Sequence, residues 1–290
     1  MTSTADVERN LATVERLVGE AVERGARLAA VPEGFAYLGP EAGKRAIAEA
    51  LPPLAGGGLG SPAAAGPDAP VLARMSRLAR EAGIELLLGG FWERAEDPDS
   101  PPYNACLVID AGGRLRARYR KVHLFDVELP DGSTIRESQS TSAGLPEAVV
   151  VDCACGPVGL SVCYDLRFPE LYRALVDRGA EVLAIPSAFT ALTGAAHWHV
   201  LLRARAIESQ CWVLAPAQSG EHFRSVRSDG REQVRESYGH ALIVDPWGVV
   251  VAEVQGMGEG VAVADVDPER TRSVRAKLPS LRHRRPWPSP

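Results

Sequence analysis

A short apolar segment that ends in a cysteine and leads directly into helix-start signals constrains this chain most. Residues 158–162 (Val-Gly-Leu-Ser-Val) are predicted to form a buried strand. Pro169 and Glu170 then open an apolar helical stripe, and Gly179 closes it. Cys163 is therefore predicted at a sharp strand-to-helix turn, the kind of turn that lifts a nucleophile above a sheet. Backbone N–H groups at a helix start would favour its thiolate.

Two more charged residues follow predicted strands. Glu33 comes just after the strand 28–31, and ligands of open α/β sheets bind at the carboxyl ends of strands. Lys121 ends the strand 115–122. The four arginines that precede Lys121 occupy every second position, so they share one face of that strand. Lys121 falls on the other face and is predicted to point toward the core or a site.

The rest of the chain alternates helices and strands and then adds hairpins. This order predicts a mixed α/β protein with buried sheets faced by helices. Helices are predicted over residues 6–23, 71–82, 169–179, 195–209 and 268–277. The other strands are predicted over residues 84–91, 104–110, 148–152, 182–185, 212–215, 239–244, 248–254 and 260–265. No internal repeat or domain boundary is found, so residues 1–290 are predicted to form a single domain.

Four stretches are predicted to lack regular structure. Residues 51–70 are Pro, Gly and Ala with almost no charge, which indicates a flexible insertion. Residues 124–141 form a long irregular stretch, of a length that is usually functional or disordered. Residues 219–237 are predicted to be a long charged surface loop. A tail rich in Pro and Arg covers residues 279–290.

Charge and cysteine content limit the kinds of partner, cofactor and cellular compartment that this chain is expected to have. The 290 residues carry a net charge of −5 without a block of like charges, so neither nucleic acid nor an anionic membrane is expected. No apolar run could span a bilayer, and no signal peptide is recognised. Five cysteines in a chain this long favour a reducing cytoplasm over a disulfide framework. Cys153 and Cys155 suggest a metal, but no second pair has ligand spacing, so no zinc and no cofactor are expected.

Three blocks of sequence carry a resemblance to a known superfamily. They are residues 31–35 (Val-Pro-Glu-Gly-Phe), 119–125 (Tyr-Arg-Lys-Val-His-Leu-Phe) and 161–168 (Ser-Val-Cys-Tyr-Asp-Leu-Arg-Phe). In sequence and order they resemble the signature blocks of the nitrilase, or carbon–nitrogen hydrolase, superfamily. Within it the chain is most similar to the Nit1-like group, the deaminated glutathione amidases. That similarity rests on residues 123–130, 136–138, 196–198, 201–208 and 237–241.

The resemblance implies an αββα sandwich that forms a homodimer or a higher homo-oligomer. It also implies a catalytic set of Cys163, Glu33 and Lys121, with Glu137 as a second active-site glutamate. In this scheme the Cys163 thiolate attacks an amide, Glu33 acts as base and then as acid, and Lys121 stabilises the oxyanion. The expected activity is hydrolysis of the terminal amide of a small anionic, glutamine-like substrate through a thioester, with release of ammonia. Deaminated glutathione is the leading candidate.

Four residues are expected to contact that substrate, namely Tyr164, Arg167, Phe189 and His197. An anionic chain needs cations at the pocket mouth. Arg167 is one candidate, unless its charge is used by Asp165. The others lie in the predicted loop, at Arg224, Arg227, Arg231 and Arg235.

The chain also departs from the family pattern at its start. The family opens with an apolar strand before its first helix, whereas residues 1–4 lead directly into the predicted helix here. The first strand is therefore expected to be missing, and the native reading frame is expected to begin upstream of Met1.

Three alternatives to the main prediction stay open. One is an ω-amidase that acts on short oxo-acid amides with the same catalytic set. Another is a Cys-His hydrolase that pairs Cys163 with His123, His197 or His240. The third is an inactive, truncated chain that serves as a binding or assembly subunit.

Overall fold

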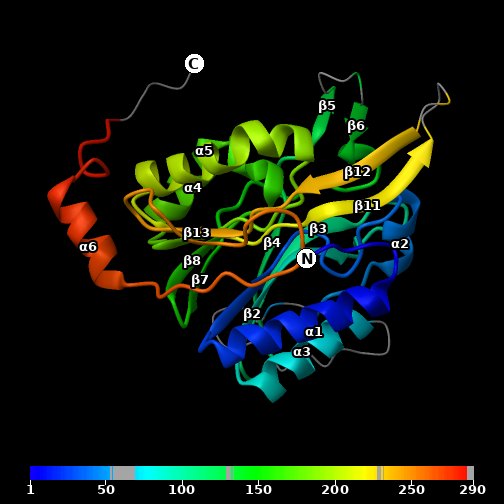
Figure 1. The fold of residues 1–290 in the computed structure, drawn as a ribbon, viewed down its shortest axis with the longest axis horizontal. Coiled ribbons are helices and arrows are strands. Elements are labelled where there is room, and N and C mark those ends of the chain that lie inside the picture. Colours follow the sequence, from blue (N-terminus) through cyan, green and yellow to red (C-terminus); the bar gives the residue numbers. More distant parts are fainter. Residues whose placement is uncertain are drawn as a thin grey trace.

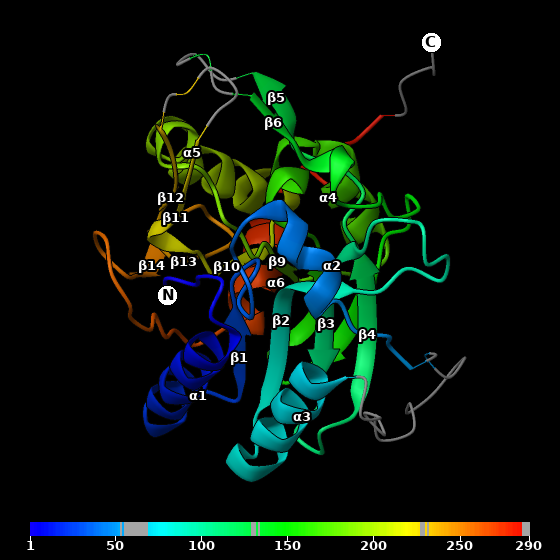
Figure 2. The same cartoon turned by 90° about the vertical axis from the view of Figure 1, so that its right-hand side faces the viewer.

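Two sheets pack face to face between two layers of helices. The computed structural model describes residues 1–52, 54, 69–128, 132, 134–226, 230 and 232–285. Helices α1 (Val7–Glu23) and α3 (Pro70–Ala82) cover one sheet, and α4 (Pro169–Asp177) and α5 (Ala191–Ser209) cover the other (Figures 1 and 2). This layer order is the expected αββα sandwich.

The first sheet has four strands in the order β1-β2-β3-β4. Their bounds are β1 (Leu28–Val31), β2 (Glu85–Glu93), β3 (Tyr103–Ile109) and β4 (Leu115–Arg120). β1 pairs with β2 in parallel, and the other pairs are antiparallel. Side chains of β2 alternate between the faces, so Leu86 and Leu88 pack with the buried side chains of α1 and α3, while Leu87 belongs to the core between the sheets.

The second sheet has six strands in the order β14-β13-β10-β9-β8-β7. Their bounds are β7 (Val150–Cys153), β8 (Gly156–Leu160), β9 (Val182–Ala184), β10 (Trp212–Ala215), β13 (Leu242–Val244) and β14 (Val250–Glu253). The central strands β8, β9 and β10 are parallel, which brings their carboxyl ends to one edge. One apolar cluster joins this sheet to α4, α5 and the inner face of the first sheet.

The predicted helices are confirmed, with ends that follow from local signals. Asp6 caps α1 by accepting a hydrogen bond from the Arg9 N–H at 3.0 Å. α3 starts at Pro70 and ends at Gly83, whose φ of +63° suits a glycine. The last helix, α6 (Pro268–Lys277), lies to one side of the sandwich (Figure 1). A short turn, η1 (Glu41–Gly43), leads into α2 (Lys44–Ile47). No described helix is long and apolar enough to cross a membrane.

The prediction of a charged loop over residues 219–237 is wrong. The stretch forms a two-stranded ribbon of β11 (Ser219–Val226) and β12 (Glu232–Tyr238); residues 227–229 and 231 lie outside the described chain. The many charged residues misled the prediction, because they follow no regular alternation. Phe223 and Arg235 line a cavity, whereas Arg224 is exposed and paired with glutamates.

Residues 124–141 also hold more regular structure than predicted. They contain a small hairpin, β5 (Asp126–Glu128) and β6 (Thr134–Arg136), followed by a 3₁₀ turn, η2 (Glu137–Gln139). Both strands are only three residues long, too short for a periodic signal. Most of the predicted insertion at 51–70 falls outside the described residues.

The predicted strand over residues 260–265 is wrong as well. The segment has an alternating pattern but pairs with no described strand, so the pattern is not realised as a ladder. Together with β1 it lines an apolar cavity of about 250 Å³. Residues 1–6 precede α1 without helix or strand, and the Met1 carbonyl accepts a hydrogen bond from the Ser219 N–H at 2.9 Å. Of the predicted tail, residues 279–285 are described.

Candidate active site

A cavity of about 540 Å³ brings together the four predicted catalytic residues, Glu33, Lys121, Glu137 and Cys163. Its volume lies within the range of roughly 300–1,000 Å³ that is typical of small-molecule sites. The first sheet supplies the segments that carry Glu33 and Lys121, and the second sheet supplies the segment that carries Cys163. The ribbon β11-β12 closes another part of the wall.

Cys163 stands at a strained turn, as the sequence predicts. It follows β8 and has a φ of +47°, a left-handed conformation that costs a residue with a Cβ roughly 1–2 kcal/mol. Its N–H donates to the Pro186 carbonyl at 2.9 Å, which ties the turn to the end of β9. The next residues form the 3₁₀ turn η3 (Cys163–Arg167), and the α-helix starts only at Pro169.

The thiol of Cys163 is protonated in this state, so the prediction of a resting thiolate is wrong. Burial and the negative charge of Glu33 raise its pKa well above the usual value, and the charge of Lys121 offsets them only in part. The prediction assumed that an α-helix starts at this cysteine. Instead, a buried carboxylate lies next to the sulfur, which favours the neutral thiol.

Lys121 is buried and held by two carboxylates. Its Nζ lies 3.0 Å from Glu33 Oε1 and 2.9 Å from both carboxylate oxygens of Glu137. Burial alone would lower the pKa of the ammonium, but the charges of Glu137 and Glu33 raise it well above the usual value. The site therefore contains a permanent cation.

Glu33 receives hydrogen bonds from both halves of the sandwich. Oε1 accepts from Asn104 Nδ2 at 2.8 Å, and Oε2 accepts from the Ala188 N–H at 2.9 Å. Burial would raise the pKa of this carboxyl, but the charge of Lys121 and the hydrogen bonds from Cys163, Lys121 and Asn104 bring the pKa below its usual value. Glu33 is therefore ionised beside a neutral thiol, as a general base requires.

Glu137 and Asn104 complete the polar cluster. Glu137 opens η2, and its Oε2 accepts from the Phe125 N–H at 2.7 Å, so its contact with Lys121 is fixed from the loop side. Asn104 lies 3.5 Å from Glu137 as well as 2.8 Å from Glu33, and its buried Oδ1 has no partner among the described residues. Sequence reasoning missed Asn104, although a polar residue at the start of an apolar strand was an available signal.

Asp165 is occupied by other groups, so of the two alternatives left open for Arg167 the pairing with Asp165 is not the one found. Its carboxylate accepts from Tyr119 Oη at 2.8 Å and from the Val162 N–H at 2.9 Å, and it contacts His123 Nδ1 at 2.7 Å. These contacts fix the backbone of the turn that carries Cys163. Arg167 has no ion-pair partner among the described residues and is available to a ligand.

Three of the four predicted substrate contacts line the cavity, namely Tyr164, Arg167 and Phe189. The Arg167 guanidinium lies over the Phe189 ring at 5.2 Å and the Tyr164 ring at 5.9 Å. His197 does not line the cavity; its Nδ1 lies 3.3 Å from Arg167 Nη1, so it can influence a substrate only through Arg167.

The arginines predicted at the pocket mouth differ in whether they line the cavity. Arg235 lines the cavity, and its Nη2 donates to the Ala188 carbonyl at 2.8 Å. Its Nη1 is buried without a partner among the described residues. Arg224 points outward and binds Glu221. Arg227 and Arg231 lie outside the described residues.

No histidine occurs among the described residues that line the cavity. His123 is engaged by Asp165, and His240 contacts Glu253 at 2.6 Å. The Cys-His alternative therefore lacks a base. Cys153 and Cys155 lie elsewhere, in the turn between β7 and β8, and burial raises the pKa of Cys155 to about 11. A neutral thiol is a poor metal ligand.

Comparison with known proteins identifies the family. A model of the carbon–nitrogen hydrolase family matches residues 1–276. The chain is 42% identical to the deaminated glutathione amidase of Synechocystis sp., over 98% of this chain and 95% of that protein. It is 43% identical to the human deaminated glutathione amidase, over 99% of this chain and 80% of that protein.

Solved structures agree. The C. elegans NitFhit protein superposes with a TM-score of 0.83 at 37% identity, covering 98% of this chain; the chain spans 63% of that protein. Saccharomyces cerevisiae Nit3, a member of branch 10 of the nitrilase superfamily, gives a TM-score of 0.76 at 29% identity, over 96% of this chain and 91% of that one. The chain therefore belongs to the carbon–nitrogen hydrolase family.

Proposed function

We propose that this protein is an amidase that hydrolyses deaminated glutathione through a thioester on Cys163. The observation that carries the proposal is one buried cluster in which a neutral thiol, an ionised carboxylate and an ammonium meet beside a large cavity. Relatives that are 42–44% identical over nearly the whole chain carry the name deaminated glutathione amidase, which supports the substrate.

The first step moves a proton as the sulfur attacks. Glu33 takes the proton of the Cys163 thiol, a new bond forms between Sγ and the amide carbon, and the carbonyl electron pair moves to oxygen. Protonation makes Glu33 neutral, so Lys121 then faces only one carboxylate, that of Glu137. The ammonium can turn one N–H toward the oxyanion at the moment when the negative charge forms there.

The second half of the reaction uses the Glu33 carboxylate twice. Glu33 donates it to the leaving nitrogen, the carbon–nitrogen bond breaks, and the acyl group stays on Cys163 as a thioester. Water then attacks while Glu33 removes its proton, and the sulfur leaves and takes that proton back. One carboxylate therefore serves as base and acid in turn, which requires a pKa that is not raised in the resting state.

The leaving group differs between the two candidate substrates, and this corrects the expectation that ammonia is released. In deaminated glutathione the amide nitrogen is that of the cysteine residue, so hydrolysis releases cysteinylglycine. Only a primary amide such as α-ketoglutaramate, the ω-amidase substrate, releases ammonia. The cavity of about 540 Å³ favours the longer molecule.

Charge also favours the longer substrate. Deaminated glutathione has a carboxylate at each end. The cavity wall contains three guanidinium groups without an ion-pair partner among the described residues, those of Arg136, Arg167 and Arg235. A charge-assisted hydrogen bond to a carboxylate contributes about 1.5–3 kcal/mol, enough to hold an unactivated amide beside Cys163.

The deciding experiment compares kcat/KM for deaminated glutathione and α-ketoglutaramate on one enzyme preparation, with cysteinylglycine and ammonia measured separately. We expect a higher kcat/KM for deaminated glutathione, with cysteinylglycine as product. A higher value for α-ketoglutaramate would make the protein an ω-amidase. Activity with neither substrate, in a folded protein that an electrophilic amide analogue does not label, would favour an inactive binding subunit.

We further propose that the protein works in a reducing cytoplasm. All five cysteines are free, and the proposed mechanism depends on the Cys163 thiol, which must stay reduced through every turnover. Fractionation of the source cells, with the native protein detected by antibody, tests this placement; recovery in a membrane or secreted fraction would contradict it.

A further inference from the structure

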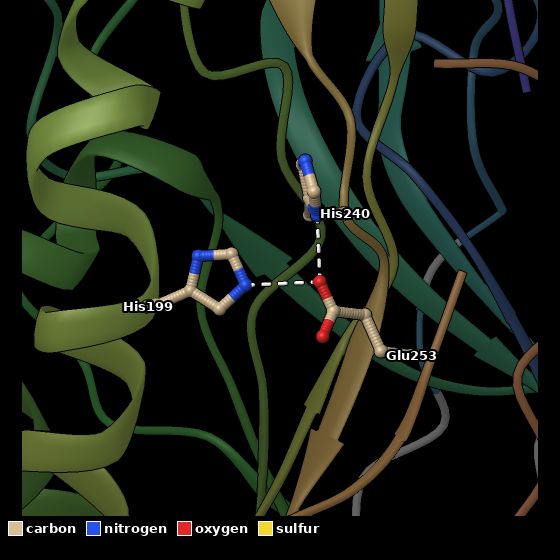
Figure 3. Close-up of side chains that lie close together, drawn as sticks. All are labelled: His199, His240 and Glu253. Atoms are coloured by element: carbon tan, nitrogen blue, oxygen red, sulfur yellow. Dashed lines mark hydrogen bonds and ion pairs between the residues drawn. The ribbon is translucent and has the colours of Figure 1, made fainter. Parts of the chain in front are cut away.

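A second cluster of chemically active side chains lies outside the catalytic cavity. It consists of His199 on α5, His240 in the turn before β13, and Glu253 at the end of β14 (Figure 3). Glu253 Oε1 lies 3.0 Å from His199 Nε2 and 2.6 Å from His240 Nδ1, and the three atoms are all within 4.8 Å of one another. None of the three residues lines the cavity that contains Cys163.

The backbone at His240 is strained in a way that aims its ring at the cluster. Its φ is +59°, a left-handed conformation that a residue with a Cβ adopts only when its surroundings enforce it. Trp198 Nε1 donates to the His240 carbonyl at 2.8 Å, and the Tyr238 ring stacks on the imidazole with centroids 4.5 Å apart. His240 is thus held in place from two sides.

The donor set suits a zinc ion. Two imidazole nitrogens and one carboxylate oxygen make up a set of three protein ligands that Zn²⁺ commonly uses, with water in the fourth position. Bonds of about 2.0–2.1 Å in a tetrahedral site separate ligand atoms by about 3.3 Å. Binding therefore requires the 2.6 Å contact between Glu253 Oε1 and His240 Nδ1 to open and the two imidazole nitrogens to lie near that separation, which calls for adjustment of all three side chains. The side chains are 21–33% exposed, which leaves a path for the ion and its water.

Glu253 also has no competing cation. Among the described residues its only charged or potentially charged contacts are His199 and His240. We propose that His199, His240 and Glu253 form a zinc-binding site in which water takes the fourth position. The ion would join α5 to the turn after β12 and to β14, which both lie more than 40 residues further along the chain than His199.

The position of this site gives the ion a structural effect on the catalytic cavity. Tyr238, which stacks on His240, donates its N–H to the Phe189 carbonyl at 2.9 Å. Trp198, one residue from His199, packs on the Phe189 ring at 5.0 Å. Zinc would therefore brace the wall that contains Phe189 without touching the reacting atoms.

The test must separate this site from the cysteines, because thiols also bind zinc. We therefore use the full chain with Cys153→Ser, Cys155→Ser and Cys163→Ala as the background. Titration with Co²⁺ reports tetrahedral coordination by its visible absorption, and Zn²⁺ should displace the cobalt at one ion per chain. Added Zn²⁺ should also raise the Tm of this background protein.

Single changes within the background identify the ligands. Glu253→Gln keeps the shape of the side chain and removes its charge; it should weaken Zn²⁺ binding by at least about 100-fold, the upper end of what losing an outer-shell partner costs. His199→Gln should do the same, and it leaves the strained backbone at His240 untouched. The control is His283→Ala, which changes an exposed histidine of the tail. This variant should bind Zn²⁺ with the same affinity as the background protein.

Two results would overturn the proposal. One is a background protein that binds no Zn²⁺ and whose Tm does not respond to it. The other is Zn²⁺ binding that is equal in the background, Glu253→Gln and His199→Gln, since the ion would then lie elsewhere on the chain. Unfolding of a variant is recognised by circular dichroism, and two separate ligand variants keep the test decisive.

Discussion

The protonated thiol of Cys163 makes the nucleophile dependent on one neighbour. Burial and the ionised Glu33 beside it raise the pKa of the thiol, and Glu33 is ionised because Lys121 lies beside it and Lys121 and Asn104 donate to it. The reactivity of the thiol therefore depends on its charged and polar neighbours together. Substituting one residue at a time should show what each of them contributes.

Cys163→Ala should fold normally and lose all measurable amidase activity, because no other described side chain in the cavity can form the thioester. Circular dichroism and Tm check the fold, and product release checks activity. Cys155→Ser is the matched control and should keep parental activity, since Cys155 lies in the turn between β7 and β8. Turnover near the parental rate in Cys163→Ala would mean that another group is the nucleophile.

Lys121→Arg should lower kcat by at least about 100-fold, the scale for one oxyanion donor. Arginine keeps the charge, but its planar fork does not fit a position that holds a compact ammonium between Glu33 and Glu137. Steady-state kinetics measure the effect. Arg118→Lys, on the outer face of β4 and paired with Glu93, is the control and should leave kcat unchanged.

Asn104→Leu tests the cause of the lowered pKa of Glu33. Catalysis needs ionised Glu33, so kcat/KM should persist toward acid and fall only as the pH drops through that lowered pKa. Removing the Asn104 hydrogen bond removes one stabiliser of the carboxylate, so the acidic limb of the kcat/KM profile should move to higher pH. The acidic limb reports an apparent pKa that belongs to the coupled Glu33–Cys163 pair. A lower kcat/KM with the acidic limb at its parental pH would show that Asn104 contributes only to packing.

At the scale of elements, the β11-β12 ribbon has one face in the cavity and one in solvent. Arg235→Ala should raise KM for deaminated glutathione by about 10-fold or more, the effect of losing a charge-assisted hydrogen bond. Arg224→Ala removes the same charge from the exposed face of the same ribbon and should change neither KM nor kcat. A fall in kcat with KM unchanged would mean that Arg235 acts by positioning Ala188 rather than by binding substrate.

The sequence predicted the elements that have strong periodic signals and failed where pairing depends on distant residues. Residues 28–31 and 212–215 form strands with the predicted bounds, and the turn at Cys163 has the predicted strain. The alternating residues 260–265 form no strand because a ladder also needs a partner. Residues 219–237 were predicted to be a loop because charged residues on both faces of the ribbon hid its period-2 pattern.

The candidate site shows a similar limit. The resemblance named Glu33, Lys121, Glu137 and Cys163, and the fold brings all four to one cavity. The protonation state of the thiol could not be predicted, because it depends on a contact between two sheets. The partners of Asp165 stayed open for the same reason, since Tyr119 and His123 reach it from the first half of the chain.

At the scale of the whole molecule, we propose that the protein forms a homodimer through α5 and the turn that follows β13. Ile207 on α5 and Trp247 in that turn are 46% and 53% exposed, and the carbonyl of Gly248 accepts from Arg203 Nε on α5 at 2.8 Å, so the two elements adjoin. Exposed apolar side chains on adjoining elements are typical of an interface.

Light scattering coupled to size exclusion should give twice the chain mass of 31.0 kDa. The double variant Ile207→Ser and Trp247→Ser should shift the protein toward monomer. Val226→Ser, which changes a 74% exposed valine on β11, should not. A parental protein that runs as a monomer at micromolar concentration would contradict the proposal.

The placement of the site between two sheets also bears on how the protein is made. Glu33, Asn104 and Lys121 precede residue 145, whereas Cys163 and the Ala188 N–H follow it. A ribosome therefore releases the base and the cation before the nucleophile, and the thiol gains its base only when the second sheet docks on the first. Fragments 1–146 and 147–290 should each be inactive and regain activity only on reassociation. In an unfinished or partly degraded chain the thiol therefore lacks its base, and we expect such a chain not to hydrolyse other amides in the cell.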